Sequence, residues 1–155
     1  MPIPSGIQAP DFSLIDESNT NRKLSDFRGH PVVLFFYPND DTPGCTTEAC
    51  GFRDDYSAYE KAHLVVLGVS PNSAESHTKF KQKYSLPFTL LVDENHKICE
   101  KYGVWGLKKL AGREYDGVFR TTFLIDSKGR IAKVFENVKP SEHSAEVLEA
   151  AKALA

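Results

Sequence analysis

The run PVVLFFY at residues 31–37 constrains the fold more than any other stretch of the sequence. It is continuous, β-branched and aromatic, and Pro38 ends it, which is the pattern of a strand buried on both faces of a sheet. Two similar runs follow, HLVVLGVS at 63–70 and FTLLVD at 88–93. Because such strands need a covering layer on each side, the three runs predict an open sheet packed between helices.

Helical patterns separate and follow these runs. Apolar residues recur after the first run at spacings of four, three, four and three, which places them on one face of a helix: Cys45, Ala49, Phe52, Tyr56 and Tyr59. A polar-faced helix is expected to begin at a Ser73 cap, and a short helix is expected to end at Gly103. The last helix, SEHSAEVLEAAKAL, should begin with Ser141 as its cap and turn Leu148 and Ala151 inward.

The remaining segments complete the order of elements. DFSLID and RKLSDF flank the turn-rich ESNTN and predict a short N-terminal extended or hairpin extension. VFRTTFLI and RIAKVFENV, joined by DSKG, predict a hairpin, whereas 104–117 is expected to form a looser segment. Strands that alternate with helices, then a hairpin and a last helix, predict an α/β fold with a central mixed sheet flanked by helices. This order is similar to the thioredoxin-like arrangement.

Composition and charge narrow the class of protein. The 155 residues, 41% of them hydrophobic, fit one globular domain over 1–155. The 19 Lys and Arg and 21 Asp and Glu give a net charge of -2 and are interspersed, so we expect neither a nucleic-acid nor an acidic membrane partner. The N-terminus lacks the pattern of an export signal, and no apolar run is long enough to span a membrane. We therefore expect a cytoplasmic protein.

The chain has three cysteines, and two of them lie in YPNDDTPGCTTEACGF at 37–52. In a reducing compartment, cysteines are metal ligands, reactive thiols or buried apolar side chains. Thr42 and Pro43 predict a helix start, with the Thr42 side chain as the cap. Cys45 then falls in the first turn, where free N–H groups and the helix dipole favour a thiolate. A residue that merely begins the apolar stripe is the alternative, and the second cysteine weighs against it.

Cys50 lies about 140° around the same helix from Cys45, away from the apolar stripe. Positions five apart in an intact helix have Cα atoms about 8.6 Å apart, whereas a disulfide tolerates at most about 7 Å. The two thiols can therefore pair only if the helix unwinds. The spacing differs from that of thioredoxin-type redox motifs and zinc sites, and no second pair exists to complete a metal site. A thiolate that alternates with a disulfide can exchange disulfides or reduce peroxides, and the wide spacing favours the second.

With these residues identified, the chain resembles a peroxiredoxin of the Q subfamily, also called bacterioferritin comigratory protein, over almost its whole length. The peroxiredoxin pattern of Pro, three residues, Thr, two residues and Cys is met by Pro38, Thr42 and Cys45. TPGCT followed by a cysteine in EACGFRD is specific to the subfamily. APDFSLID, LSDFRG, KYGVWG and RTTFLID are also similar to it.

The resemblance implies a role for each of five residues. Cys45 would be the peroxidatic cysteine and Cys50 the resolving cysteine, which forms an intramolecular disulfide with it. The Thr42 hydroxyl would bind the thiolate and the peroxide, Pro38 would shield the sulfur, and Arg120 would stabilise the thiolate and polarise the peroxide. The implied activity is reduction of hydrogen peroxide and organic hydroperoxides by a monomer without metal or other cofactor. Thioredoxin or a similar dithiol would recycle the enzyme.

Several alternatives stay open at this point. Glu48 is either a surface residue or the partner that orients Arg120, and Cys99 is a buried small side chain or a secondary resolving thiol. Trp105 packs in the core or borders the mouth of the site, and GLKKLAGR is a solvated loop or a docking segment for a reductant. None of the five histidines is expected to act as a base. The rival functions are a thioredoxin-fold disulfide oxidoreductase and a peroxide-responsive redox sensor or holdase.

Overall fold

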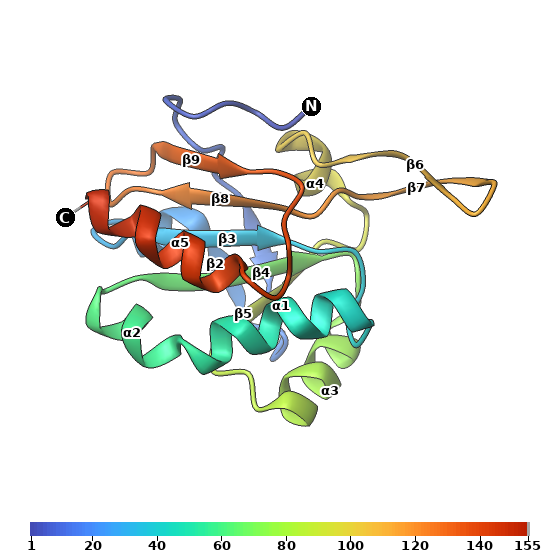
Figure 1. Ribbon diagram of the computed structural model, residues 1–155, viewed down its shortest axis with the longest axis horizontal. Helices are drawn as coiled ribbons and strands as arrows, with labels where there is room; N and C mark the ends of the chain where they lie inside the picture. The colour runs from blue at the N-terminus through green and yellow to red at the C-terminus, as the bar shows by residue number, and fades with distance from the viewer. Residues whose placement is uncertain (155) are drawn as a thin grey trace.

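The computed structural model describes residues 1–154 (Figure 1). Two 3-10 turns, Leu24–Phe27 and Lys152–Leu154, accompany the helices and strands. The strands are β1 (Ser13–Ile15), β2 (Asn21–Lys23), β3 (Val32–Phe36), β4 (Val65–Ser70), β5 (Thr89–Val92), β6 (Trp105–Leu110), β7 (Arg113–Val118), β8 (Thr121–Ile125) and β9 (Ile131–Phe135). The helices are α1 (Pro43–Asp54), α2 (Tyr56–Lys61), α3 (Ala74–Tyr84), α4 (Lys97–Lys101) and α5 (His143–Ala151).

The main sheet has five strands in the order β5-β4-β3-β8-β9. Strands β3, β4 and β5 are parallel, β8 is antiparallel to β3, and β9 is antiparallel to β8. The predicted mixed α/β sheet is therefore confirmed, and β3, the run that led to the prediction, lies at its centre. Phe36 at the end of β3 pairs with Thr121 at the start of β8. This pairing brings the loop after β3 next to Arg120.

The side chains of β3 alternate between two hydrophobic layers, as the period of a strand requires. Phe35 packs with Phe52 of α1 and Val147 of α5 on one face of the sheet. On the opposite face, Phe36 packs with Tyr102, which follows α4, and with residues of the N-terminal segment. Both faces of the central strand are thus covered, as its uninterrupted apolar sequence predicts. The N-terminal extension also forms, as the antiparallel pair β1 and β2.

The prediction of a looser segment at 104–117 was wrong. Strands β6 and β7 form an antiparallel hairpin there, which projects from the body of the molecule (Figure 1). Ala111 and Gly112, with φ of 53° and 80°, form its two-residue turn. A turn with positive φ at both positions suits the twist of a hairpin, but alanine is an unusual residue for it. The hairpin also exposes most of its residues on both faces, so no hydrophobic alternation marked it in the sequence.

Smaller differences concern the helix starts. The Ser73 cap is confirmed, because the Ser76 N–H donates to Ser73 Oγ at 3.2 Å. Ser141 does not cap the last helix, which begins at His143 after Glu142, and only Ala151 of the two expected inward residues is fully buried. The last four residues of RKLSDF, Leu24–Phe27, form a 3-10 turn instead of an extended piece. Within residues 1–154, no helix is long and apolar enough to cross a membrane.

Candidate active site

Cys45 lies in the first turn of α1, at the carboxyl end of β3. The helix begins at Pro43, as predicted, and only 1% of Cys45 is exposed. Ala49 and Phe52 continue the buried stripe along the same helix. Helix α1 ends before Asp55, and α2 begins directly after it. Tyr59 therefore extends the buried stripe from a second helix. The amphipathic pattern thus holds Cys45 against the core at the end of the sheet where parallel strands place their functional loops.

Thr42 is the N-cap residue of α1 by position, but its side chain does not cap the helix. Its hydroxyl donates to the Asn39 carbonyl oxygen at 2.9 Å. Its own carbonyl accepts the first helical hydrogen bond, from the Thr46 N–H, at 2.8 Å. The predicted side-chain cap was therefore wrong, because no helix N–H donates to the hydroxyl oxygen, which instead donates its hydrogen within the loop before the helix. The hydroxyl stabilises this loop and leaves its lone pairs available.

Arg120 lies between β7 and β8 and reaches the sulfur of Cys45. Its Nη2 atom donates to Cys45 Sγ at 3.2 Å. Gly44 permits this approach, since a Cβ atom at that position would lie 3.1 Å from Nη2. Burial lowers the pKa of Arg120, but the negative charges of Glu48 and Cys45 outweigh this effect and raise it overall. The guanidinium therefore stays charged and supplies a fixed cation beside the sulfur.

Glu48 is the second partner of Arg120, so that the alternative of a surface residue is excluded. Its side chain is 0% exposed, and Oε1 accepts from Arg120 Nη1 at 2.7 Å. This length is typical of a charge-assisted hydrogen bond. Burial raises the pKa of Glu48 to about 7, and the Arg120 charge and hydrogen bond oppose this rise. Arg120 is thereby fixed between a buried carboxyl group and the sulfur.

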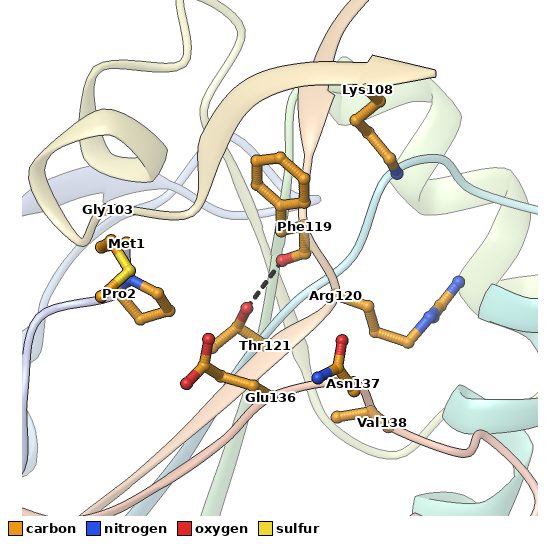
Figure 2. A pocket seen from close by; sticks show the side chains of 10 residues that line it. All are labelled: Met1, Pro2, Gly103, Lys108, Phe119, Arg120, Thr121, Glu136, Asn137 and Val138. Atoms are coloured by element: carbon orange, nitrogen blue, oxygen red, sulfur yellow. Dashed lines mark hydrogen bonds between the residues drawn. The ribbon is translucent and has the colours of Figure 1, made fainter. Parts of the chain in front are cut away.

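Two cavities flank this centre, and Lys108 of β6 borders both. The first, of about 380 Å³, is lined by Arg120 together with Phe119, Val138 and Pro2 (Figure 2). The Lys108 Nζ atom donates to the Val118 carbonyl at 2.9 Å. Burial and the Arg120 charge lower the pKa of Lys108, against the opposing charge of Cys45.

The second cavity, of about 320 Å³, lies between the loop after β3 and the β6–β7 hairpin. Pro38 and Trp105 line it, so Trp105 borders the region of the site. The Trp105 ring also stacks on His96, with centroids 3.9 Å apart. Lys108 was missed by the sequence reasoning, which placed its segment in a solvated loop. Because the β6–β7 hairpin was not predicted, no sequence pattern indicated that Lys108 lies near the site.

The three cysteines are free and differ in environment. Cys50 is half-buried on the intact α1, and burial raises its pKa. Cys99 is 0% exposed, and burial together with Asp93 raises its pKa far above the ordinary range. Of the two alternatives for Cys99, a buried small side chain or a secondary resolving thiol, the structure therefore favours the first. As neutral thiols, Cys50 and Cys99 are weak nucleophiles in this folded state.

Two buried histidines were also missed. His77 of α3 contacts Asp40 Oδ2 through Nδ1 at 2.7 Å and the Leu91 carbonyl oxygen through Nε2 at 2.8 Å. Tyr37 also donates to this carboxylate, at 2.6 Å, and the cluster ties the loop after β3 to α3. His143 lies on α5 behind Glu48. Within residues 1–154, no three His, Cys, Asp or Glu side chains come together in a way that could hold a metal ion.

A five-stranded mixed sheet with a cysteine at the start of the helix after its central strand, in contact with a partly buried arginine, defines the class of thioredoxin-like thiol peroxidases. The model of the AhpC/TSA family matches residues 5–134. The chain belongs to this family and, within it, to the Bcp or Q-type peroxiredoxins, which are thiol peroxidase enzymes.

Relatives with this name match almost the whole chain. Peroxiredoxin Bcp of Bacillus subtilis is 51% identical over 98% of this chain and 97% of its own length. Peroxiredoxin Bcp of Escherichia coli K12 is 46% identical over 95% of this chain and 94% of its own. Among solved structures, the bacterioferritin comigratory protein of Xanthomonas campestris, which has alkyl peroxide reduction activity, superposes with a TM-score of 0.89 at 33% identity, covering 96% of this chain and 98% of its own. The predicted family and fold are confirmed.

Proposed function

We propose that Cys45 is the peroxidatic cysteine of an enzyme that reduces hydrogen peroxide and organic hydroperoxides. The observation that carries this proposal is the contact of Arg120 Nη2 with Cys45 Sγ at 3.2 Å, at the start of a helix. The thiolate attacks one peroxide oxygen, so that an S–O bond forms as the O–O bond breaks. The sulfur is oxidised by two electrons to a sulfenic acid, and the leaving oxygen takes a proton to give water or an alcohol.

Arg120, Thr42 and Pro38 assist this step. Arg120 stabilises the thiolate and the negative charge that develops on the leaving oxygen, because it is a fixed cation in a largely buried position. The lone pairs of the Thr42 hydroxyl accept a hydrogen bond from the peroxide. Pro38 shields the sulfur from water in the loop that Thr42 and Asn39 close. Polar groups held in place before the reaction need no reorganisation during it.

The cavity beside Arg120 supports organic hydroperoxides as substrates. Its apolar part is lined by Phe119, Val138 and Pro2, and Arg120, which contacts Cys45, also lines it (Figure 2). The organic substituent of a hydroperoxide can pack against these apolar side chains while the O–O group reaches the Cys45 sulfur. The Xanthomonas campestris relative, which reduces alkyl peroxides, shares the fold.

Cys50 is the resolving cysteine in this proposal. Its thiol attacks the Cys45 sulfenic acid, an S–S bond forms, and water leaves. Because both residues lie on one continuous helix, the step requires the first turns of α1 to unwind. Thioredoxin or a similar dithiol then reduces the disulfide by thiol–disulfide exchange. Both cysteines come from one chain, so a monomer is sufficient.

Single cysteine variants test these roles. Cys45→Ser is expected to lose peroxide reduction. Cys50→Ser should consume about one equivalent of peroxide and then stop when thioredoxin is the only reductant, because the sulfenic acid has no partner thiol. Cys99→Ala is the matched control and should turn over like the wild type, since Cys99 is completely buried. Stopped-flow kinetics and mass spectrometry of the disulfide measure both steps.

Three results would contradict the proposal. Steady turnover of Cys50→Ser with thioredoxin would exclude Cys50 as the resolving residue. A disulfide between Cys45 and Cys99 in the oxidised wild type would assign the resolving step to the other cysteine. Rapid insulin reduction without peroxide consumption would instead indicate a disulfide oxidoreductase.

A further inference from the structure

The two oxygens of the Glu48 carboxyl group lie in different surroundings. Oε1 accepts from Arg120 at 2.7 Å. Oε2 is completely buried and has no hydrogen-bond partner. The Nε2 atom of His143 lies 3.8 Å from it. An unpartnered carboxylate oxygen in a protein interior is costly, so the neighbouring imidazole is the group that can compensate it.

His143 is held rigidly in this position. Its ring is 1% exposed and packs edge-on against Phe52 and Phe135, with centroids 5.6 and 5.4 Å away. Nδ1 contacts Glu146 Oε1 at 3.0 Å, and Nε2 contacts Thr122 Oγ1 at 2.7 Å. An ionised Glu146 can only accept, so Nδ1 carries a hydrogen, and in the neutral ring Nε2 accepts from the Thr122 hydroxyl.

Protonation of the His143 ring changes the charge beside the Glu48 carboxyl group. The second hydrogen lies on Nε2, which faces both Thr122 Oγ1 and Glu48 Oε2. The positive charge then compensates the buried carboxylate from the side opposite Arg120.

The charged groups that face the ring are Glu48 from α1, Glu146 from α5 itself and Arg120 from the start of β8, whereas β9 contributes only Phe135. Burial lowers the pKa of His143 and outweighs the raising effect of Glu146. Burial raises the pKa of Glu48 to about 7. The two groups also lie close enough for proton binding at one to affect proton binding at the other.

We propose that His143 is a positioning residue, which shares one proton with Glu48 and so keeps the buried cluster around the Cys45 thiolate free of net negative charge. With this proton, the charges of Arg120 and the thiolate balance. Without it, Glu48 is an additional anion that competes with the thiolate for the Arg120 guanidinium. The inference rests on the proposed roles of Cys45 and Arg120 and adds the group that controls their pH dependence.

The pH profile of the peroxide reaction in His143→Gln tests this inference. The glutamine side chain fills a similar volume and can donate to Glu48, but it cannot bind the proton. The second-order rate constant is expected to fall on the order of threefold to tenfold below wild type at about pH 7.5, since tenfold corresponds to one unit on the pH axis. This pH lies above the Glu48 pKa of about 7, whereas at about pH 6 Glu48 carries the proton itself in both enzymes and the rates should agree. The two enzymes should converge at about pH 8.5, where the wild-type pair has also lost its proton.

The matched control is Ser144→Ala. Ser144 is the next residue of α5, and its hydroxyl donates to Asp55 at 2.6 Å without contact with Glu48. The Ser144→Ala substitution should weaken the contact between α5 and Asp55 and leave the pH profile of the peroxide reaction unchanged. A His143→Gln profile that superposes on wild type, or a defect of equal size at every pH, would overturn the inference. Neither result would affect the proposed function, which the cysteine variants test separately.

A second measurement needs neither activity nor a His143 variant. The ring of His143 can be titrated by nuclear magnetic resonance in the reduced wild type and in Glu48→Gln. Because coupled groups titrate as a pair, the wild-type ring should titrate in two steps, and the variant ring in one step at lower pH. The same titration curve in both proteins would overturn the inference even if His143→Gln failed to fold.

Discussion

Arg120 and Cys45, separated by 75 positions in the sequence, meet with Nη2 and Sγ 3.2 Å apart. Three features of the fold produce this contact. The pairing of Phe36 with Thr121 places the end of β3 beside the start of β8, and Gly44 leaves room for the guanidinium. Glu48 then fixes its other nitrogen. The arginine therefore has one orientation, with one amino group directed at the sulfur.

Loss of Arg120 should slow the peroxide reaction strongly. Arg120→Met is expected to lower the second-order rate constant by on the order of 10²-fold to 10³-fold, as when one preorganised donor is removed from an active site. Arg120→Lys should retain part of the rate, because it keeps the charge and loses the fork that binds both partners. Stopped-flow kinetics measure both. A rate within about twofold of wild type in Arg120→Met would contradict the proposed role.

The same substitution should destabilise the fold, since it leaves the buried Glu48 carboxyl group without its charge-assisted hydrogen bond to Arg120. Adding Glu48→Gln to Arg120→Met removes the buried acid and is expected to restore stability without restoring the rate. Urea unfolding compares the single and double variants. If rate and stability recovered together, the loss of activity would be a consequence of unfolding instead of the missing guanidinium.

Glu48 should make the folded protein less stable as the pH rises. Its pKa is about 7 in the folded state and 4.5 in the unfolded chain. Between these values the folded protein holds a proton that the unfolded chain has released, so stability decreases as the pH rises through this window. Glu48→Gln removes the effect and should gain stability relative to wild type between about pH 5 and about pH 8. Urea unfolding at several pH values measures the difference. Parallel stability curves would contradict a buried, titrating Glu48.

The sequence predicted the elements that bury apolar residues and missed those that do not. Val32–Phe36 was recognised because burial on both faces makes the run continuously apolar, and the stripe from Cys45 to Tyr59 because burial of one helix face imposes a period on the residues. The β6–β7 hairpin has no such period, since most of its side chains are exposed. Its turn also uses Ala111 where asparagine or aspartate would have been a signal.

In the candidate site, likewise, residues of a local motif could be predicted from the sequence, and residues placed by tertiary packing could not. Cys45, Cys50 and Thr42 follow from a local motif, and Arg120 followed only from the family resemblance. Glu48 could be named as a possible partner of Arg120, but its complete burial depends on how α5 packs over α1. The contact of His143 with Glu48 joins residues from two helices and has no local pattern. Lys108 depends on the hairpin that was not predicted.

Cys99 should be inert in the folded protein. It is completely buried, and burial with Asp93 raises its pKa far above the ordinary range. An alkylating reagent in excess is expected to modify Cys99 only at the rate of unfolding, and in denaturant it should modify all three cysteines. Mass spectrometry of the modified peptides measures this. Modification of Cys99 as fast as that of the half-exposed Cys50 would show that the core opens locally there.

Oxidation should unwind the first turns of α1. In the reduced protein the helix is continuous from Pro43 to Asp54 and carries both free cysteines. Cα atoms five positions apart in a helix are about 8.6 Å apart, and a disulfide requires less than about 7 Å. Backbone hydrogen bonds such as that from the Thr46 N–H to the Thr42 carbonyl should therefore break when the disulfide forms.

Hydrogen exchange of the reduced and oxidised protein measures this change. Amides in the first half of α1 should lose protection on oxidation, whereas those of the central strand β3 should keep it, because its register does not depend on the helix start. Cys50→Ser treated with one equivalent of peroxide is the control. It forms the sulfenic acid without a disulfide and should stay helical. Full protection of α1 in the oxidised wild type would exclude a bond between Cys45 and Cys50, since an intact helix holds these residues too far apart.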